Sequence, residues 1–572
     1  MHVVLDVIFV LGLSAAFGAQ MLRWLRVLQR EHYEASALAR FVGRWSSPQV
    51  AAVPRSKVRL EQASVTVRTA PRDDFQGASR FEQDRLRPKA QRGVRRPFTL
   101  THVLIFAFVV ALLVKNEYAP VAVAVIFGLF TPWGLSIKGR TGPLVWTRRA
   151  TTTATVATVV SVGIACIGLV SNRPWLPAAV VVWAVPVILD LTTRALKPYE
   201  EHRSKAFVDQ AVARLNRVHP RVVAITGSYG KTSTKNHLAQ IMGDDGIVVT
   251  PRSFNNRAGL SRAINENLAD GTRVFVAEMG TYGPGEIADL CRWCPPDVAV
   301  ITAIGPVHLE RFRSEDRIVE SKSEITGPAD DVVLQVDDPR LAALADRLAS
   351  QGKRVVRCSA SDRTADVCVV RSGDGSHLSA YANGEALAED VELPTGLQPS
   401  NLACAIAVAL LVKVDAATIG DRVRDLPGVE HRLQAVSAVS GATILDDTYN
   451  SNPAGASEAL AALAGSAGVG EPVGSNRPGR LVVVTPGMVE LGSRQFEENR
   501  RFGAAAAVVA TDLLIVERTN RKALLAGVAS VPGTSVSVRV LRDRNRAVDW
   551  VKEHVTAGDT VLYENDLPDH YP

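Results

Sequence analysis

Apolar residues are concentrated in the first third of this 572-residue chain. Five apolar stretches there are each close to the roughly 20 residues that a helix needs to cross a bilayer. They cover residues 1–21, 98–114, 118–137, 151–170 and 175–191. Buried helices of a soluble domain do not account for five such runs so close together. The pattern therefore predicts an α-helical membrane region with five crossings over residues 1–193.

Basic residues predict the orientation of this region. Arginines crowd the loop at residues 23–97, and residues 138–149 are basic too. Loops rich in arginine and lysine stay on the cytoplasmic side of a membrane. With five crossings, the chain after residue 192 is then expected in the cytoplasm, where ATP is available. The first stretch lacks the preceding positive charges and the cleavage site of a signal peptide, which indicates a retained anchor in the plasma membrane.

After residue 194 the apolar pattern changes to short runs that alternate with helical segments. A linker is expected at 197–203 and an amphipathic helix at 207–218. The runs that predict strands are 221–225, 246–250, 274–278, 298–302, 481–485, 513–516 and 536–540. This alternation is typical of α/β domains. We expect a central domain at 194–427 and a smaller Rossmann-like domain at 428–572, with a surface loop at 461–476.

Composition argues against a nucleic-acid-binding protein, a disulfide-bonded protein and a zinc protein. The net charge of +7 arises largely in the first third, and no basic stripe interleaved with aromatic residues indicates a nucleic-acid groove. Six irregularly spaced cysteines indicate a reducing compartment without a disulfide framework. Cys291 and Cys294 are spaced like half of a zinc site, but no second pair follows at a suitable distance. They are therefore expected to be ordinary helix residues.

The clearest chemical signal is the sequence ITGSYGKTSTKN at residues 225–236, which follows a short apolar run. Gly227 and Gly230 allow backbone N–H groups to approach a phosphate, and the start of the next helix adds partial positive charge. Lys231 would reach the β- and γ-phosphates, and the Thr232 hydroxyl would hold Mg²⁺. Two residues lie between the glycines, where the common phosphate-binding loop has four. The order of strand, loop and helix predicts a nucleotide site.

Two further polar residues follow predicted strands. Glu278 ends the strand at 274–278, and His308 follows the strand at 298–302. The carboxyl ends of parallel strands meet at one edge of a sheet, so both side chains are expected beside the loop and its Mg²⁺. Taken alone, each is more often a solvated residue, but their order after the loop favours a site.

The chain resembles the Mur ligase family, and most closely its MurF-like branch, which joins a dipeptide to a nucleotide-linked peptide. The matching stretches occur in family order at residues 226–234, 255–259, 278–287, 308–312, 321–325, 399–401, 430–434 and 446–453. Several short motifs in the right order are more specific than any one of them. The resemblance covers residues 203–503.

The resemblance implies an ATP-dependent ligase that needs Mg²⁺ and acts on a carboxylate and an amine substrate. ATP would phosphorylate the carboxylate, and the amine would then displace phosphate from the acyl phosphate. Catalysis would be electrostatic, through cations that offset the charge on the transferring phosphoryl group. A lipid-linked or polymeric acceptor in the cell envelope would be consistent with the membrane region.

The resemblance also implies roles for individual residues. Contacts with ATP fall to Gly227, Ser228, Tyr229, Gly230, Lys231, Thr232, Ser233, Asn401, Arg432 and Asp447, the last through the ribose. Metal ligation falls to Thr232, Glu278, His308 and Lys322, and catalysis to Lys231, Glu278, His308 and Lys322. At the position of Lys322 the family has an N-carbamylated lysine, an anion that supports a second Mg²⁺. Asn255 and Asn256 match positions that contact the acceptor.

Two departures from the family leave the substrate open. Membrane helices replace the N-terminal domain that holds the UDP-sugar carrier, and residues 560–572 lack the Lys-Gly-Ser sequence expected after the last strand. The alternatives are a nucleotide-regulated transporter or sensor and a non-catalytic partner of another enzyme. The few charges within the predicted membrane helices disfavour a transport pathway. The intact set Lys231, Thr232, Glu278, His308 and Lys322 disfavours a decayed enzyme.

Overall fold

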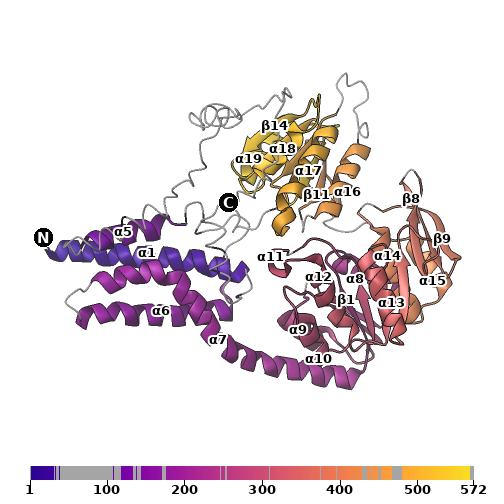
Figure 1. Cartoon of the computed structure of the whole chain (residues 1–572), viewed down its shortest axis with the longest axis horizontal. Helices are drawn as coiled ribbons and strands as arrows, with labels where there is room; N and C mark the ends of the chain where they lie inside the picture. Colours follow the sequence, from indigo (N-terminus) through magenta and orange to yellow (C-terminus); the bar gives the residue numbers. More distant parts are fainter. Residues whose placement is uncertain are drawn as a thin grey trace.

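The computed structural model describes most of the chain. It covers residues 2–30, 118–132, 144–170, 175–251 and 254–566, apart from 245, 308, 374, 395, 428–433, 439, 449–451 and 467–478. Six isolated residues before residue 144 are described as well: Tyr33, Leu38, Phe41, Ala107, Leu135 and Ile137. Most of the predicted stretch 98–114 and of the basic loop lies outside the described residues, as do His308 and Arg432. Figure 1 shows three parts: a group of N-terminal helices, a central domain and a C-terminal domain.

Four helices of the N-terminal group are among the described residues. They are α1 (His2–Arg30), α5 (Tyr118–Phe130), α6 (Arg148–Val170) and α7 (Trp175–Val218). In the described part of the chain, α1, α6 and α7 are long and apolar enough to cross a membrane by length and composition. The third predicted crossing, at residues 118–137, is shorter than expected, because α5 ends at Phe130 just before Pro132. A proline lacks the N–H that would continue the helix.

Side chains of α1 donate hydrogen bonds to the backbone carbonyls at the end of α5. The Arg23 guanidinium donates to the carbonyls of Gly128 at 2.8 Å, Thr131 at 3.0 Å and Leu135 at 3.2 Å. The amide of Gln20 donates to the carbonyls of Gly128 and Thr131 as well. The last carbonyls of a helix have no partner within the helix. These bonds therefore satisfy the end of α5 and hold α1 against it.

The predicted linker at 197–203 is wrong, because α7 is one continuous helix of 44 residues. It contains Pro186 and Pro198, and a proline removes one helical hydrogen bond without forbidding the helix. Two ion pairs join residues one turn apart: Asp190 with Arg194 at 2.9 Å lies between the prolines, and Lys197 with Glu201 at 3.8 Å spans Pro198. The charged residues around Pro198 are good helix formers, so α7 stays helical from the N-terminal group to the central domain (Figure 1).

The central domain contains a nine-stranded sheet in the order β2-β3-β1-β4-β5-β6-β7-β8-β9. The strands are β1 (Arg221–Thr226), β2 (Ile247–Val249), β3 (Val274–Glu278), β4 (Val298–Ile301), β5 (Asp331–Gln335), β6 (Arg354–Ser359), β7 (Val367–Arg371), β8 (His377–Ala382) and β9 (Glu385–Glu392). All pairs are parallel up to β7, and the last two are antiparallel. Because β1 lies between β3 and β4, the ends of these three strands are neighbours.

Helices cover both faces of this sheet. They are α8 (Lys231–Met242), α9 (Arg257–Asn267), α10 (Glu286–Trp293), α11 (Leu309–Phe312), α12 (Glu315–Ser323), the 3-10 helix η2 (Glu324–Thr326), α13 (Pro339–Ser350), α14 (Pro399–Leu411) and α15 (Ala416–Arg424). One apolar core joins the sheet to α8, α14 and α15. The other joins it to the end of α7 and to α9, α10 and α13. The end of α7 is thus part of the central domain, and the predicted boundary at 193/194 falls inside this helix.

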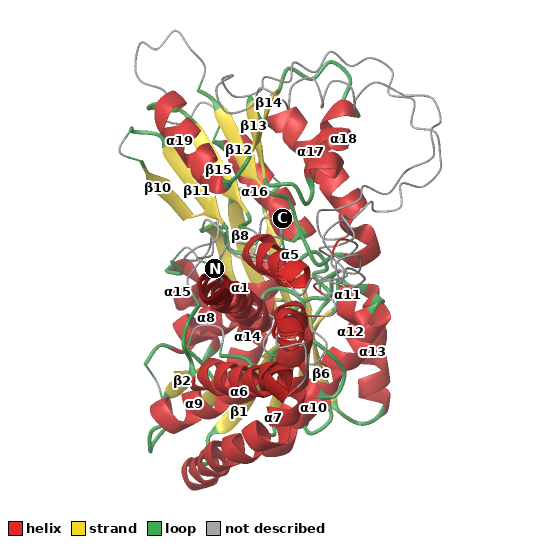
Figure 2. Cartoon of the chain, turned by 90° about the vertical axis from the view of Figure 1, so that its left-hand side faces the viewer, coloured by secondary structure: helices red, strands yellow, loops and turns green. Residues whose placement is uncertain are grey.

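The C-terminal domain is a second, smaller α/β unit. Its elements are β10 (Gln434–Ser437), β11 (Thr443–Asp447), α16 (Pro453–Gly465), β12 (Leu481–Thr485), η3 (Gly492–Arg494), α17 (Gln495–Val509), β13 (Asp512–Val516), α18 (Arg521–Ala529), β14 (Ser537–Leu541), α19 (Arg544–His554) and β15 (Thr560–Glu564). The sheet order is β10-β11-β15-β12-β13-β14, parallel except for the first pair. Helices α16, α17 and α18 pack on one face and α19 on the other (Figure 2). The loop predicted at 461–476 is wrong for residues 461–465, which continue α16.

Candidate functional site

The phosphate-binding loop follows β1, the strand between β3 and β4. Gly230 has φ 82°, a left-handed conformation that favours glycine, and it caps the start of α8. A Cβ atom on Gly230 would lie 2.0 Å from Asn401 Oδ1, and one on Gly227 would lie 2.1 Å from Thr302 Oγ1. Larger residues would therefore push α14 or the end of β4 away from the loop. Close packing therefore requires glycine at both positions, in addition to their predicted role in phosphate access.

Two lysines meet at the Gly227 carbonyl oxygen. Lys231 Nζ, from the first residue of α8, donates to it at 2.8 Å. Lys322 Nζ, from α12, donates to the same oxygen at 3.0 Å. Lys322 is buried, and this burial, together with the positive charge of Lys231, lowers its pKa well below the usual value for lysine. The structure thus brings together two predicted catalytic residues that are 91 positions apart in the sequence (322 − 231).

Glu278 lies at the end of β3 and is the centre of a buried polar cluster. Its carboxylate accepts hydrogen bonds from Thr232 Oγ1 at 2.9 Å, Lys235 Nζ at 3.2 Å and Asn255 Nδ2 at 3.3 Å. Lys235 Nζ also donates to the Thr250 carbonyl at 2.8 Å. Burial lowers the pKa of Lys235, and the charge of Glu278 opposes that shift. Thr232 and Glu278 were predicted together, and they are within hydrogen-bonding distance.

The oxygen atoms of this cluster fit a hard divalent cation. Mg²⁺ prefers oxygen ligands and usually takes one or two from protein carboxylates, completing its shell with phosphate oxygens and water. Glu278 and the Thr232 hydroxyl provide such a pair beside the phosphate-binding loop. The described residues contain no group of three or more His, Cys, Asp or Glu side chains placed for a metal. A phosphate-assisted site therefore fits these residues better than an all-protein site.

Lys235 was missed by the sequence analysis. It follows Lys231 by four residues in α8, and residues at this spacing share one face of a helix. Its side chain is almost completely buried and pairs with Glu278 at 3.2 Å. Lys235 therefore fixes the carboxylate that Thr232 also contacts. The spacing alone does not reveal this pair, because Glu278 lies 43 residues away in the sequence.

The two asparagines predicted to contact an acceptor differ in their contacts. Asn255 reaches the site and donates to Glu278, and its carbonyl accepts from the Gly280 N–H at 2.7 Å. Asn256 is exposed, and its side-chain oxygen caps α9 by accepting from the Gly259 N–H at 3.0 Å. Asn256 thus sets the start of α9, while Asn255 links this loop to the Glu278 carboxylate.

Asn401 and Ser228 secure the loop from two other elements. The Asn401 carbonyl, in the first turn of α14, accepts from Thr234 Oγ1 at 3.3 Å. Ser228 Oγ donates to the Gly305 carbonyl at 3.2 Å. Ser233 is buried within the first turn of α8. All three residues therefore lie at or beside the loop after β1, and their contact with ATP stays a prediction.

Tyr229 extends from this loop toward the C-terminal domain. A Cβ atom on Gly305 would lie 2.2 Å from the Tyr229 ring, so only glycine leaves room there. Burial raises the pKa of the phenol, and the charges of Glu315 in α12 and Glu498 in α17 raise it further. Glu315 also pairs with Arg494 of the C-terminal domain at 2.6 Å. The phosphate-binding loop is therefore next to the contact between the two α/β domains.

In the C-terminal domain, Asp447 ends β11 next to a buried acid. It is in register with Glu564 at the end of β15, and its carbonyl accepts from the Asn565 N–H at 3.1 Å. Glu564 is fully buried and accepts a short hydrogen bond from Thr485 Oγ1. Burial raises its pKa to about 8, with a further contribution from Asp447. The sequence analysis missed Glu564, since only the strand register brings it beside Asp447.

Cys291 and Cys294 belong to the apolar core. Cys291 is in α10 and Cys294 is the residue that follows its last turn, and both are buried. Burial raises the pKa of Cys291 to about 12, and the nearby Glu324 carboxylate acts in the same direction. Both side chains pack in the core that includes α9 and α10. The prediction that they are helix residues is correct for Cys291, whereas Cys294 lies just beyond the helix.

Comparison with known proteins covers the two α/β domains. A family model for the Mur ligase middle domain matches residues 225–409, and one for the Mur ligase glutamate ligase domain matches residues 431–563. UDP-N-acetylmuramoyl-tripeptide–D-alanyl-D-alanine ligase from Mycobacterium leprae is 30% identical over 371 residues, which are 60% of this chain and 70% of that protein. The same-named ligase from Mycobacterium tuberculosis is 31% identical over 309 residues. Those residues are 52% of this chain and 59% of that protein, so less than two thirds of it is matched.

Solved structures show the same fold. MurF from Acinetobacter baumannii superposes with a TM-score of 0.52 at 22% identity, covering 64% of this chain and 77% of that one. MurF from Thermotoga maritima in complex with ADP gives a TM-score of 0.52 at 24% identity, covering 64% and 80%. The predicted α/β architecture of the two domains is thereby confirmed.

Proposed function

Since this chain belongs to the Mur ligase family, and so to the ATP-dependent acid–amino-acid ligases, we propose that it joins an amine to a carboxylate through an acyl phosphate at the loop after β1. The observation that carries this proposal is the meeting of Lys231 and Lys322 at the Gly227 carbonyl. A phosphate-binding loop that only regulates has no need of a second, buried lysine on the same oxygen.

The residues of the site divide the work of phosphoryl transfer. The N-terminus of α8 and the Lys231 ammonium group bind the β- and γ-phosphates. Thr232 and Glu278 would hold Mg²⁺, which when bound offsets negative charge on the phosphates. The substrate carboxylate oxygen attacks the γ-phosphorus, and the bond to ADP breaks. The amine then attacks the acyl carbon, loses a proton and expels phosphate, so an amide, ADP and phosphate result.

The environment of Lys322 favours carbamylation. Carbon dioxide reacts with a neutral amine to give a carbamate and a proton, and a protonated lysine does not react. The buried site and the nearby Lys231 lower the pKa of Lys322 and so favour the neutral amine. A carbamate would turn a cation beside the phosphates into an oxygen anion, which is suited to a second Mg²⁺. His308, proposed as a further ligand of that ion, lies outside the described residues.

The nucleotide, metal and acceptor contacts predicted at the remaining positions stay part of this proposal. They are Gly227, Ser228, Tyr229, Gly230, Ser233, Asn401, Arg432 and Asp447 for ATP, and Asn255 and Asn256 for the acceptor. Support comes from the contacts of Ser228 and Asn401 at the loop after β1 and of Asn255 with Glu278, and from the position of Asp447 at the end of β11. Direct observation of bound ATP and acceptor would test each of them.

We further propose that the N-terminal helices anchor the enzyme in the plasma membrane, with both α/β domains in the cytoplasm and a lipid-linked or polymeric acceptor. Support comes from three described helices long and apolar enough to span and from the arginine-rich loop. Protease added outside intact cells should leave residues 85–96 and the C-terminus uncut. Cleavage within 85–96 from outside would invert this topology.

The activity itself is tested by ADP release from the purified full-length protein. We expect release that requires both a carboxylate and an amine from a panel of peptide and amino-acid substrates. Lys231→Ala should eliminate it, and Lys522→Ala, an exposed lysine of α18, should leave it unchanged. ADP release that is independent of both substrates would favour a nucleotide-driven switch over a ligase.

A further inference from the structure

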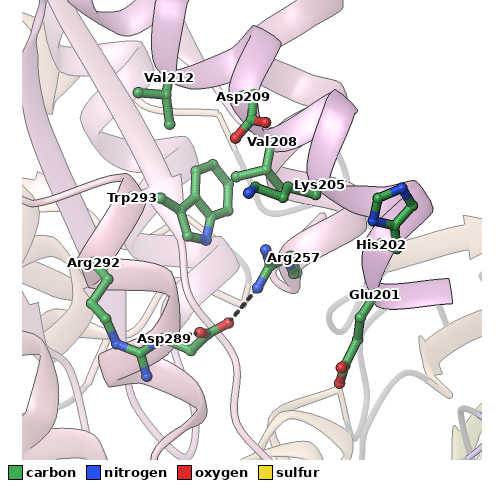
Figure 3. A pocket seen from close by; sticks show the side chains of 10 residues that line it. All are labelled: Glu201, His202, Lys205, Val208, Asp209, Val212, Arg257, Asp289, Arg292 and Trp293. Carbon is green, nitrogen blue, oxygen red and sulfur yellow. Dashed lines mark hydrogen bonds and ion pairs between the residues drawn. The ribbon is translucent and has the colours of Figure 1, made fainter. Parts of the chain in front are cut away.

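A pocket of about 590 Å³ lies where α7 crosses α9 and α10, and we call it the α7 pocket (Figure 3). Six of its lining side chains are His202, Lys205 and Val208 from α7, Arg257 from α9, and Arg292 and Trp293 from α10. None of these residues took part in the site described above. The wall formed by α7 precedes the region matched by the Mur ligase models.

The α7 pocket is close in sequence to the proposed catalytic cluster, because residues of both lie on the same two segments. Arg257 directly follows Asn255 and Asn256, and Asn255 donates to Glu278. α10 follows β3, the strand that Glu278 ends. A ligand that enters between α7 and α9 therefore reaches the start of α9, one short loop from the proposed metal and phosphates. This position suits a part of a substrate that lies some distance from its reacting group.

Two guanidinium groups in this pocket share one acidic partner. Arg257 and Arg292 share a single carboxylate, that of Asp289, at 3.0 Å and 2.8 Å. Arg257 Nε and Trp293 Nε1 are buried N–H groups without a hydrogen-bond partner among the described residues. Buried N–H groups normally have an acceptor. These two N–H groups are closed to solvent, so the donors that a ligand can reach are the exposed side chains of Lys205 and Arg292.

The pocket also carries acceptors and an apolar surface. The carboxylates of Glu201 and Asp209 line it together with Asp289, so a purely anionic ligand such as a diphosphate would meet repulsion. A hydrocarbon would leave the charged groups without solvent or partners. The Trp293 ring and Val208 offer a surface for an aliphatic chain (Figure 3). These features together match a peptide that bears both a carboxylate and an amine.

We propose that the α7 pocket binds a peptide segment of the acceptor that carries both charges, and so positions the acceptor for the reaction at the phosphate-binding loop. This inference rests on the proposed ligase function. The segment of α7 before the family-matched domains would then be one wall of the acceptor site.

Binding without ATP tests this proposal separately from catalysis. The probe is the tripeptide Ala-Glu-Lys, titrated calorimetrically into the full-length protein carrying Lys231→Ala, which removes ATP turnover but leaves the pocket intact. The charge reversals Lys205→Glu and Arg292→Glu, at side chains on the pocket surface, should each weaken binding at least tenfold. Arg217→Glu, an exposed residue of α7 outside the pocket that pairs with Asp270, should leave binding unchanged.

Other outcomes overturn the proposal. An absence of tripeptide binding, tighter binding of inorganic pyrophosphate than of the tripeptide, or an equal loss in Arg217→Glu would each exclude it. Retained ADP binding in the charge-reversal variants, in the background with Lys231 intact, shows that they are folded. Substrate-dependent ADP release by the wild-type protein, if tripeptide binding fails, would leave the ligase function standing and remove only the pocket.

Discussion

Each of the two sheets contains a buried strand whose last residue is a glutamate, and the two glutamates have different surroundings. Glu278 at the end of β3 is 1% exposed and accepts hydrogen bonds from Thr232, Asn255 and the ammonium group of Lys235. Glu564 at the end of β15 is 0% exposed, accepts from the Thr485 hydroxyl and is close to Asp447. A buried carboxylate keeps its charge only with a compensating partner. The central edge therefore pairs its buried acid with a cation, Lys235, whereas at the C-terminal edge burial and the nearby Asp447 raise the pKa of Glu564 to about 8.

The strongest test of this contrast is Lys231→Ala, which removes a cation from the central edge. We expect kcat/KM for ATP-dependent ligation to fall by ~10³-fold or more, the scale of losing a charged group beside a transferring phosphoryl. Lys231 begins α8 within the central domain, so membrane association should be unchanged. The measurement is ADP release together with fractionation of membranes. Wild-type turnover in the variant would remove this loop from the mechanism.

Replacing Lys322 tests whether the second lysine acts as a cation or as a carbamate. Lys322→Ala and Lys322→Arg should both lose ~10²-fold or more in kcat, since arginine keeps the positive charge but does not form the carbamate. ADP should still bind to both variants through Lys231 and Thr232, as measured by equilibrium titration. Because a carbamate resembles a carboxylate, excess acetate should partly restore Lys322→Ala. An active Lys322→Arg enzyme would exclude the carbamate without affecting the ATP site.

Glu278→Gln would leave the buried Lys235 ammonium without its acidic partner. Removing one member of a buried pair typically costs about 3–5 kcal/mol of unfolding free energy. We therefore expect a lower thermal unfolding midpoint for the central domain in the detergent-solubilised full chain, together with loss of Mg²⁺-dependent activity. Glu278→Gln combined with Lys235→Met should recover much of the stability but none of the activity. A single variant as stable as the wild type would show that the pair is not coupled.

Glu564→Gln is the matched change at the C-terminal edge, and its effect should be smaller and dependent on pH. Glu564 has a pKa of about 8 in the folded protein and 4.5 as its ordinary value. Between these values the folded state binds more protons than the unfolded state, so stability falls as pH rises from about 4.5 to about 8. Neutral glutamine should remove this slope and be the more stable variant above pH 8. Parallel stability profiles for the two proteins would contradict the buried, protonated acid.

The sequence predicted the central edge well because its signals are local. The loop after β1, the acid that ends β3 and the family position of Lys322 all lie in short stretches whose residue types have a direct chemical meaning. Lys235 was missed although it is one helical turn from Lys231. Its role depends on a carboxylate 43 residues away, and no short stretch contains both partners.

The remaining differences have the same origin in long-range packing. Glu564 is significant only because β15 pairs with β11, and the sequence gives no direct sign of that pairing. Pro198 and its charged neighbours resemble a linker, but ion pairs one turn apart and packing against the central domain keep α7 helical through them. The length of the apolar stretch predicted a longer α5. The helix instead ends at Phe130, and Arg23 donates a hydrogen bond to the Gly128 carbonyl in its last turn.

Because α7 is one continuous helix, it sets a fixed distance between the proposed membrane region and the central domain. With the chain up to residue 191 in the bilayer, as proposed, 27 residues of the same helix (218 − 191) remain before it ends, about 40 Å at 1.5 Å per residue. A helix holds its length, whereas a disordered linker would let the enzyme search a wide range of heights. An acceptor in the same membrane must therefore present its carboxylate at a height set by the length and tilt of α7. Molecules too short to reach that height would be rejected before any chemical recognition takes place.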